Sequence, residues 1–393
     1  MAGPLKGLKI LDFTTLLPGP YATMTLADLG ADVLQIVSGS RPDLTAFWPP
    51  FIPGTEISAA GAMLGRGKRS MTLNLKDPRA VEIVKKLIAE HDILIEQFRP
   101  GVMRRLGLDY ETLRRTNPAL IYCSLTGYGQ SGPMENRAGH DINYLSRAGV
   151  MSYSGRKKTG PTLTGMQIAD VASGSNNAII GILAAVIHRQ NAKEGQHIDV
   201  SMTDGVLAFN TFAGAAFLSD GREPGYETEL LNGGSLYDFY ETKDGKYISF
   251  GGLEPQFFSA FCGVIGRPDL IPGGVAPPEL SLIKEEVRTI IKTKTREEWV
   301  ALFSTVDACV EPVLSLEEAL ADPQTKARQM VIETPLPQGK TARQIGHPIH
   351  FSVTPPDYGP SGFPAGAHTR EVLQELGYQE AGIEEFAKSG LFK

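Results

Sequence analysis

Cysteine is scarce in this sequence and forms no recognisable pattern. The 393 residues include only three cysteines, Cys123, Cys262 and Cys309, and no CxxC or Cys/His ligand spacing joins them. An odd number of widely separated cysteines argues against a disulfide framework and against a zinc site. We therefore expect reduced thiols, a cytoplasmic location and no bound metal.

Long hydrophobic runs and an excess of positive charge are also absent. The longest apolar stretch, from Ala178 to His188, is shorter than the roughly 20 residues that a membrane-spanning helix needs. The chain carries 38 Lys and Arg against 44 Asp and Glu, a formal net charge of −6. These features predict no membrane partner and no nucleic-acid partner. An anionic small molecule stays compatible with a local basic cluster.

A dinucleotide-binding motif is missing as well, although the first part of the chain alternates strand and helix patterns. Alternation of this kind predicts a parallel sheet with helices on its faces, that is, an α/β fold with a Rossmann-like large domain. The turn after the first strand, residues 14–20, lacks G-x-G-x-x-G, which argues against a nicotinamide or flavin dinucleotide. The strand patterns cover residues 8–13, 31–37, 70–75, 93–95 and 120–124, and helical patterns cover 18–29 and 77–90.

The middle of the chain follows a different pattern. Asp244-Gly245 separates two strand-like runs, at residues 235–240 and 246–250, and Asp-Gly between such runs is a strong hairpin signal. Helical patterns follow the hairpin. We expect a smaller α+β domain to follow the large one. The expected boundaries are 1–205 for the large domain, 206–228 for a linker, 229–330 for the small domain, and 331–393 for a linker and return to the large domain.

Two short motifs carry side chains suited to moving a proton. His140 lies within the stretch 137–144, and Asp170 lies within 168–174, each at the start of a helical pattern. A histidine and a carboxylate are the groups that remove a proton from carbon and return it. A lone histidine is more often structural, so the pair gains weight from a third motif, residues 251–258, which carries Glu254.

The order of several motifs makes the chain resemble the family III CoA-transferase superfamily, the carnitine-CoA-transferase-like group. Within it the likeness is greatest to the α-methylacyl-CoA racemases, and it spans nearly the full length. One stretch, residues 41–56, reads as an insertion. The motifs that carry the resemblance are residues 5–13 with 18–20, 66–70, 98–107, 127–129, 193–196, 309–313 and 368–369.

The resemblance implies a catalytic role for Asp170. In the transferases of the superfamily this aspartate is a nucleophile that forms an acyl-aspartyl anhydride. The racemases instead share Gly-His-Asp-Ile-Asn-Tyr at His140 and Glu-Pro-Gln-Phe at Glu254. The expected reaction is therefore racemisation at the α-carbon of 2-methyl-branched acyl-CoA thioesters, by a His/Asp two-base mechanism through an enolate. A CoA-transferase that uses Asp170 as nucleophile is the alternative.

Further residues take expected roles beside this pair. Glu254 would orient the His140 ring, with Asp141 as the competing candidate, and Tyr144 would pack or contact the substrate. Backbone N–H groups near Asp170 and Val171 would stabilise the enolate oxygen.

Coenzyme A also needs cations for its phosphates. Arg66, Lys68 and Arg69 lie in one short basic segment, and Arg99 and Arg104 form a second group. Guanidinium groups bind phosphate in a bidentate mode. For each of these residues, a solvated surface charge is the alternative interpretation.

The resemblance finally implies an interlocked homodimer. Its large domain comes from both ends of the chain, and Glu254 would reach the site from the partner of the chain that gives His140 and Asp170. No cofactor is expected, because coenzyme A enters as part of the substrate.

Overall fold

The computed structural model describes residues 3–392, and the chain forms two compact units. Unit 1 comprises the residues up to Ala148, Gly165–Phe209 and those from Gln324 onward. Unit 2 comprises Gly149–Thr164 and Asn210–Pro323. The main borders therefore lie at residues 209/210 and 323/324, and the assignment of Gly149–Thr164 to unit 2 was not foreseen from the sequence.

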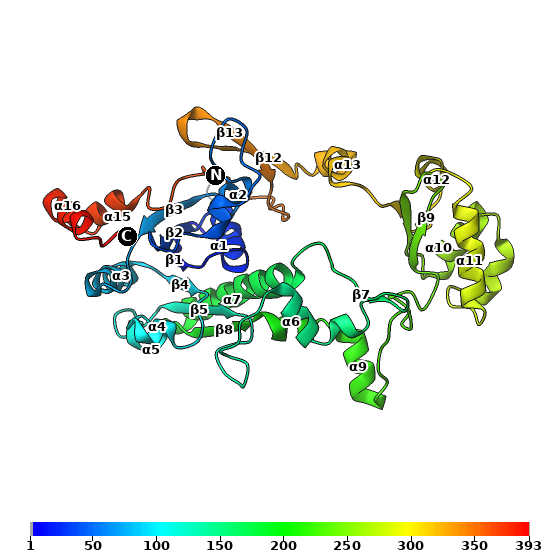
Figure 1. Ribbon diagram of the computed structural model, residues 1–393, viewed down its shortest axis with the longest axis horizontal. Helices are drawn as coiled ribbons and strands as arrows, with labels where there is room; N and C mark the ends of the chain where they lie inside the picture. The colour runs from blue at the N-terminus through cyan, green and yellow to red at the C-terminus, as the bar shows by residue number, and fades with distance from the viewer. Residues whose placement is uncertain (1–2, 393) are drawn as a thin grey trace. The chain divides into compact units, whose positions relative to one another are not determined.

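Unit 1 is built on a six-stranded sheet in which every neighbouring pair is parallel (Figure 1). The strand order is β3-β2-β1-β4-β5-β8, so the direction of winding reverses between β1 and β4. This confirms the predicted α/β fold with a parallel sheet. The strands are β1 (Lys9–Phe13), β2 (Asp32–Val37), β3 (Lys68–Thr72), β4 (Ile93–Glu96), β5 (Ile121–Thr126) and β8 (His197–Ser201).

One face of this sheet is covered by α3 (Pro78–Glu90), whose ends and face follow from its sequence. Asp77 accepts a hydrogen bond from the Arg79 N–H, and Pro78 occupies the first turn, where its missing N–H costs nothing. Residues of one helix face, at three- and four-residue spacing, are buried against Leu11, Leu34 and Met71: Ala80, Ile83, Val84, Leu87 and Ile88.

The last part of the chain completes this side of unit 1. Helices α15 (Thr369–Glu375) and α16 (Glu380–Lys388) bury Val372 and Ile383 in the same core as α3. The N–H of His368 donates to the Ser70 carbonyl (2.9 Å), and the N–H of Thr72 donates to Thr369 Oγ1 (3.0 Å). The C-terminal segment therefore covers the outer edge of β3.

The other face carries a continuous helix made of a π-helical turn, η3 (Ala169–Ser175), and α7 (Asn176–Ala192). Within the described residues, one helix, Ala169–Ala192, is long enough and apolar enough to cross a membrane, judged by length and composition alone. The expectation drawn from Ala178–His188 underestimated this length. The helix packs on β5 and β8, as a core helix of similar composition does, so its length by itself identifies no membrane segment.

Unit 2 contains a three-stranded antiparallel sheet of order β11-β10-β9. The predicted hairpin is present as β9 (Asp238–Glu241) and β10 (Tyr247–Phe250), and Gly245 has φ 73° in the turn between them. The sheet pairs further with β11 (Val310–Pro312) and packs on α10 (Pro255–Val264), α11 (Leu280–Ile291) and α12 (Arg296–Phe303).

The other elements are shorter or lie at the margins of the units. In unit 1 they are η1 (Leu44–Phe47), α2 (Ala59–Leu64), α4 (Val102–Arg105), α5 (Tyr110–Leu113), α6 (Asp141–Arg147), α8 (Met202–Ala208), β12 (Val331–Pro335), η5 (Pro337–Gly339) and β13 (Thr341–Ile345). In unit 2 they are η2 (Val150–Ser152), β6 (Gly155–Arg156), β7 (Gly160–Pro161), α9 (Thr211–Asp220), η4 (Pro268–Gly273) and α13 (Leu316–Ala321); α14 (Pro323–Ala327) spans the border.

Candidate active site

The turn after β1 lies where the strand order reverses, which is the usual ligand-binding edge of an open parallel sheet. Leu16 has a left-handed φ of 64°, and Asp43 Oδ2 accepts its N–H at 2.9 Å. The carbonyl of Pro18 accepts the Ser175 hydroxyl (2.6 Å), and Gln97 Oε1 accepts the Gly19 N–H (3.2 Å). This turn is thereby tied to η3 and to the loop after β4, so three segments meet at the carboxyl edge.

Asp170 lies in the π-helical turn η3, half-buried. Burial, and after it the charge of Asp141, raise the pKa of its carboxyl to about 6, against the opposite effect of His140. A carboxyl with this pKa exchanges between its acid and its base form close to neutral pH. Single π-helical turns frequently occur at functional sites.

His140 caps the start of α6, beside Asp170. Its backbone N–H donates to Asn143 Oδ1 (3.0 Å), and its side chain is exposed. Asp141 Oδ1 accepts the N–H of Asp170 at 3.0 Å, which joins α6 to η3. Tyr144 is buried and donates its hydroxyl to the Gly139 carbonyl at 2.5 Å. The structure thus brings His140, Asp141, Tyr144 and Asp170 together within unit 1.

The N–H groups expected to stabilise an enolate are already occupied. Asp170 donates its N–H to Asp141, and Val171 donates its N–H to the Gln167 carbonyl at 3.0 Å. Each N–H has one proton to donate, so the prediction that these two groups form an oxyanion hole is wrong for this conformation.

Glu254 belongs to unit 2, where it directly precedes α10 with an exposed side chain. Its expected action on His140 stays a prediction.

Arg66 and Lys68 are buried inside unit 1. The Arg66 guanidinium donates to both carboxylate oxygens of Asp28 (2.9 and 2.7 Å) and to Gln344 Oε1 (2.8 Å). Lys68 Nζ bonds Thr23 Oγ1 (2.7 Å) and pairs with Asp12 (3.3 Å), and burial lowers its pKa. Both side chains are engaged inside the fold and are too buried to meet a phosphate from solution.

Arg69 is likewise engaged. It pairs with Asp32 (3.3 Å) and Glu375 (2.8 Å), which ties β3 to β2 and α15. The buried positions of Arg66 and Lys68 argue against the phosphate role that the sequence suggested for them. For Arg69, whose side chain is 25% exposed, that role stays a prediction.

Arg99 and Arg104 are exposed, and no carboxylate within residues 3–392 pairs with either of them. Arg99 lies in the loop after β4, beside Gln97, and Arg104 lies in α4. Both are therefore free to meet an anion at this end of the sheet.

Two arginine side chains near α6 were not predicted as site residues from the sequence. Arg137 and Arg147 line a cavity of about 450 Å³ with Tyr128 and Asn143. The only signal available was the position of Arg137, three residues before His140.

A larger cavity, of about 620 Å³, lies over β2 and β3 and shares no residue with the His140–Asp170 pair. Residues of η1, α2 and the segment 362–365 contribute to its lining. Of its basic side chains, Lys68 and Arg69 have carboxylate partners, and Lys340 donates to the Gly54 carbonyl at 2.6 Å. We assign the chemistry to the His140–Asp170 neighbourhood, because an exposed histidine and a half-buried carboxyl meet there.

Glu96, at the end of β4, was also missed. It is buried, its Oε2 accepts the Phe98 N–H (2.8 Å), and Ser124 next to it bonds His197 Nε2 (3.0 Å). Burial raises the pKa of Glu96 to about 7, against the hydrogen bonds from Ser124 and Phe98. Glu96 and Ser124 are buried, His197 is exposed, and together they link β4, β5 and β8 below the loop that carries Gln97 and Arg99.

Comparison with known proteins identifies the family of this chain. The family model described as CoA-transferase family III matches residues 5–369. The chain is 35% identical to human alpha-methylacyl-CoA racemase over 382 residues, 96% of this chain and 95% of that protein. It is 34% identical to succinate–glutarate CoA-transferase of Agrobacterium fabrum over 389 residues, 95% of this chain and 96% of that protein. The two identities are too similar to separate a racemase from a transferase.

Solved structures agree with the fold. A CAIB/BAIF family protein from Brucella suis superposes with a TM-score of 0.84 at 29% identity, covering 96% of this chain and 100% of that one. The Rv3272 protein of Mycobacterium tuberculosis superposes with a TM-score of 0.79 at 25% identity, covering 94% of this chain and 98% of that one.

Proposed function

We propose that this chain, which belongs to CoA-transferase family III and acts on acyl-CoA thioesters, racemises the α-carbon of 2-methyl-branched acyl-CoA. The observation that carries this proposal is the adjacency of His140 to Asp170, whose pKa burial raises to about 6. A carboxyl with this pKa supplies both a base and an acid near neutral pH, and the imidazole beside it is a second group able to exchange a proton.

The proposed reaction moves one proton off carbon and one proton on. One of the two residues, as base, takes the α-proton, and the electron pair of the broken C–H bond moves onto the thioester oxygen as an enolate. The other residue, as acid, then gives its proton to the opposite face of the α-carbon, and the C=O bond reforms. The reverse direction exchanges the two roles, so neither residue has to cross the substrate.

Acyl transfer is the second candidate, and the similar identity to a CoA-transferase favours it. In that reaction an Asp170 oxygen attacks the thioester carbonyl, the C–S bond breaks, and coenzyme A leaves as the thiolate. The thiolate then attacks the aspartyl carbonyl of the resulting acyl-aspartyl anhydride, which releases the first acid and leaves an aspartyl–CoA thioester. A second carboxylate attacks this thioester to give a new anhydride and free thiolate, and the thiolate takes the new acyl group and frees the Asp170 carboxylate. This route needs Asp170 as a carboxylate and gives His140 no required role.

Incubation of the protein with one enantiomer of a 2-methylacyl-CoA in deuterated water, without an acceptor acid, tests the proposal. We expect deuterium at the α-carbon and a product with nearly equal amounts of the two enantiomers. His140→Ala and Asp170→Asn should each reduce this exchange at least about a hundredfold. His188→Ala, at an exposed histidine of α7, is the matched control and should leave it unchanged.

Absence of deuterium after prolonged incubation would overturn the racemase proposal. A hydroxylamine-sensitive acyl adduct on Asp170, together with transfer of coenzyme A to a free acid, would establish the transferase instead.

We also propose that the active form is a homodimer in which Glu254 of the partner subunit completes each site. Support comes from the apolar surface that a single chain leaves exposed. Helix α9 buries none of its residues, and its Phe212 and Leu218 are 80% and 86% exposed. Large apolar patches of this kind usually mark an interface.

A further inference from the structure

The chain between the two proposed catalytic residues does not stay in unit 1. It leaves unit 1 after Ala148, just beyond the end of α6, and re-enters at Gly165, shortly before η3. The residues between, Gly149–Thr164, belong to unit 2 and are called here the excursion. The elements that carry His140 and Asp170 are therefore the two ends of one segment that is anchored elsewhere.

Backbone groups of the excursion are bound at several points by side chains of unit 2. Tyr226 donates its hydroxyl to the Met151 carbonyl (3.0 Å), and Asn232 donates its amide to the Tyr153 carbonyl (3.0 Å). Tyr153 in turn donates its hydroxyl to Asn210 Oδ1 at 2.6 Å. These contacts fix the first half of the excursion to unit 2.

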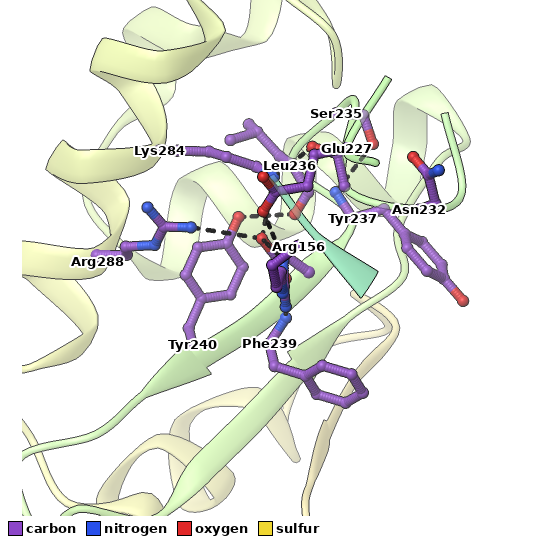
Figure 2. Close-up of polar contacts among 12 residues, drawn as sticks. Arg156, Glu227, Asn232, Ser235, Leu236, Tyr237, Phe239, Tyr240, Lys284 and Arg288 are labelled. Atoms are coloured by element: carbon purple, nitrogen blue, oxygen red, sulfur yellow. Dashed lines mark hydrogen bonds and ion pairs between the residues drawn. The ribbon is translucent and has the colours of Figure 1, made fainter. Parts of the chain in front are cut away.

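Among the described residues of the excursion, Arg156 in β6 makes the charged contacts to unit 2. Its Nη2 and Nη1 donate to the two oxygens of Asp238 (2.7 and 3.2 Å), and Nη1 also reaches Glu227 Oε1 at 3.2 Å. Figure 2 shows Arg156 and Glu227 within this group of polar contacts, together with Lys284 and Arg288. The next N–H, of Lys157, donates to Glu227 Oε2 at 3.2 Å. A two-pronged guanidinium contact fixes position and direction together.

Asp238 keeps partners when Arg156 is removed. Its side chain is 3% exposed and also pairs with Lys284 (3.0 Å) and Arg288 (3.5 Å), both in α11. Its Oδ1 accepts the Phe239 N–H at 2.8 Å. Loss of Arg156 therefore leaves no unpaired buried carboxylate, and unit 2 should keep its fold.

We propose that Arg156 is a positioning residue for the reaction: by fixing the excursion to Asp238 and Glu227, it sets the spacing of α6 and η3, and hence of His140 and Asp170. This inference rests on the proposed function. Both residues must face one α-carbon at the same time, and a displacement of about 1 Å is enough to slow such a reaction by orders of magnitude.

The test compares Arg156→Ala and Arg156→Lys with Arg288→Ala in the full-length protein. Arg288→Ala removes a cation from the same carboxylate but leaves the excursion untouched, so it is the matched control. We expect Arg156→Ala to lower kcat for α-proton exchange about tenfold to a hundredfold, with KM changed less than about twofold. Arg156→Lys, which keeps the charge but loses the two-pronged contact, should fall between.

Amide hydrogen–deuterium exchange gives a readout that does not depend on activity. Protection in α6 and in residues 165–175 should fall in Arg156→Ala and persist in Arg288→Ala, while α10 and α12 stay protected in both. Equal protection of α6 and η3 in all variants would overturn the inference. If protection falls in Arg156→Ala but the wild type exchanges no α-proton, Arg156 still positions α6 and η3, and only the proposed reaction is rejected.

Discussion

Asp141 acts on Asp170 in two separable ways. Its Oδ1 accepts the Asp170 N–H at 3.0 Å, and its negative charge adds to burial in raising the Asp170 pKa to about 6. Asp141→Asn keeps an acceptor oxygen and removes the charge. The pKa of Asp170 should then fall, so the acid limb of kcat/KM for α-proton exchange should move to lower pH.

The measurement is the pH profile of exchange between about pH 4.5 and 8. Asp220→Asn, an exposed aspartate at the end of α9, is the control and should keep the wild-type profile. An acid limb that stays in place in Asp141→Asn would show that the Asp141 charge does not act on Asp170.

Single residues also mark where reasoning from sequence ends. Asp141 and Asp170 were found because their motifs lie within short, ordered stretches. Arg66 and Arg99 look alike in sequence, since the carboxylate that engages Arg66 is Asp28, 38 positions away. Whether an arginine is free to bind a ligand depends on such distant partners, which the spacing of neighbouring residues does not reveal.

At the level of elements, the end of β4 is pH-sensitive through Glu96. Burial raises its native pKa to about 7 from an ordinary value of 4.5. The native state therefore keeps a proton that the unfolded chain loses between these values. By linkage, the Glu96 contribution to the free energy of unfolding falls as pH rises through this window, by about 2 kcal/mol between about pH 5 and 8.

Urea unfolding of the wild type and of Glu96→Gln at the two pH values checks this. The variant keeps an acceptor for the Phe98 N–H and cannot ionise. The difference in free energy of unfolding, variant minus wild type, should therefore increase by about 2 kcal/mol from about pH 5 to about pH 8. Glu90→Gln, at an exposed glutamate of α3, should show no such difference. A constant gap between wild type and Glu96→Gln would mean that Glu96 ionises normally.

Elements with a strong period were predictable, and elements held by distant contacts were not. The parallel strands and the Asp244-Gly245 hairpin carry local patterns, and the structure has them. The excursion has strands of only two residues each, β6 and β7, and its anchor Arg156–Asp238 joins positions 82 apart. The sequence predicted a helical pattern at Asp170 but no π-helical turn, because side-chain spacing does not show which carbonyl accepts each backbone N–H.

For the whole molecule, the proposed dimer makes a sharp prediction. Chains with His140→Ala and chains with Glu254→Ala should each be inactive alone. Co-refolded together, they should regain activity, because a heterodimer then holds one site with both residues intact. Mixed without unfolding, they should stay inactive, since interlocked chains do not exchange. Heterodimers shown to be present but inactive would place Glu254 in the same site as the His140 of its own chain.

The C-terminal cover of β3 has a consequence for how the protein is made. Residues 368–391 are synthesised after everything else that unit 1 needs, yet His368 and Thr369 bond β3, and the Leu391 carbonyl accepts the Asn74 N–H at 2.8 Å. Unit 2 ends at Pro323 and is complete while the edge of β3 is still bare. A nascent chain therefore exposes an open strand edge until residues 368–391 have been made, and a ribosome that stalls within this stretch releases a sheet ready to pair with another chain.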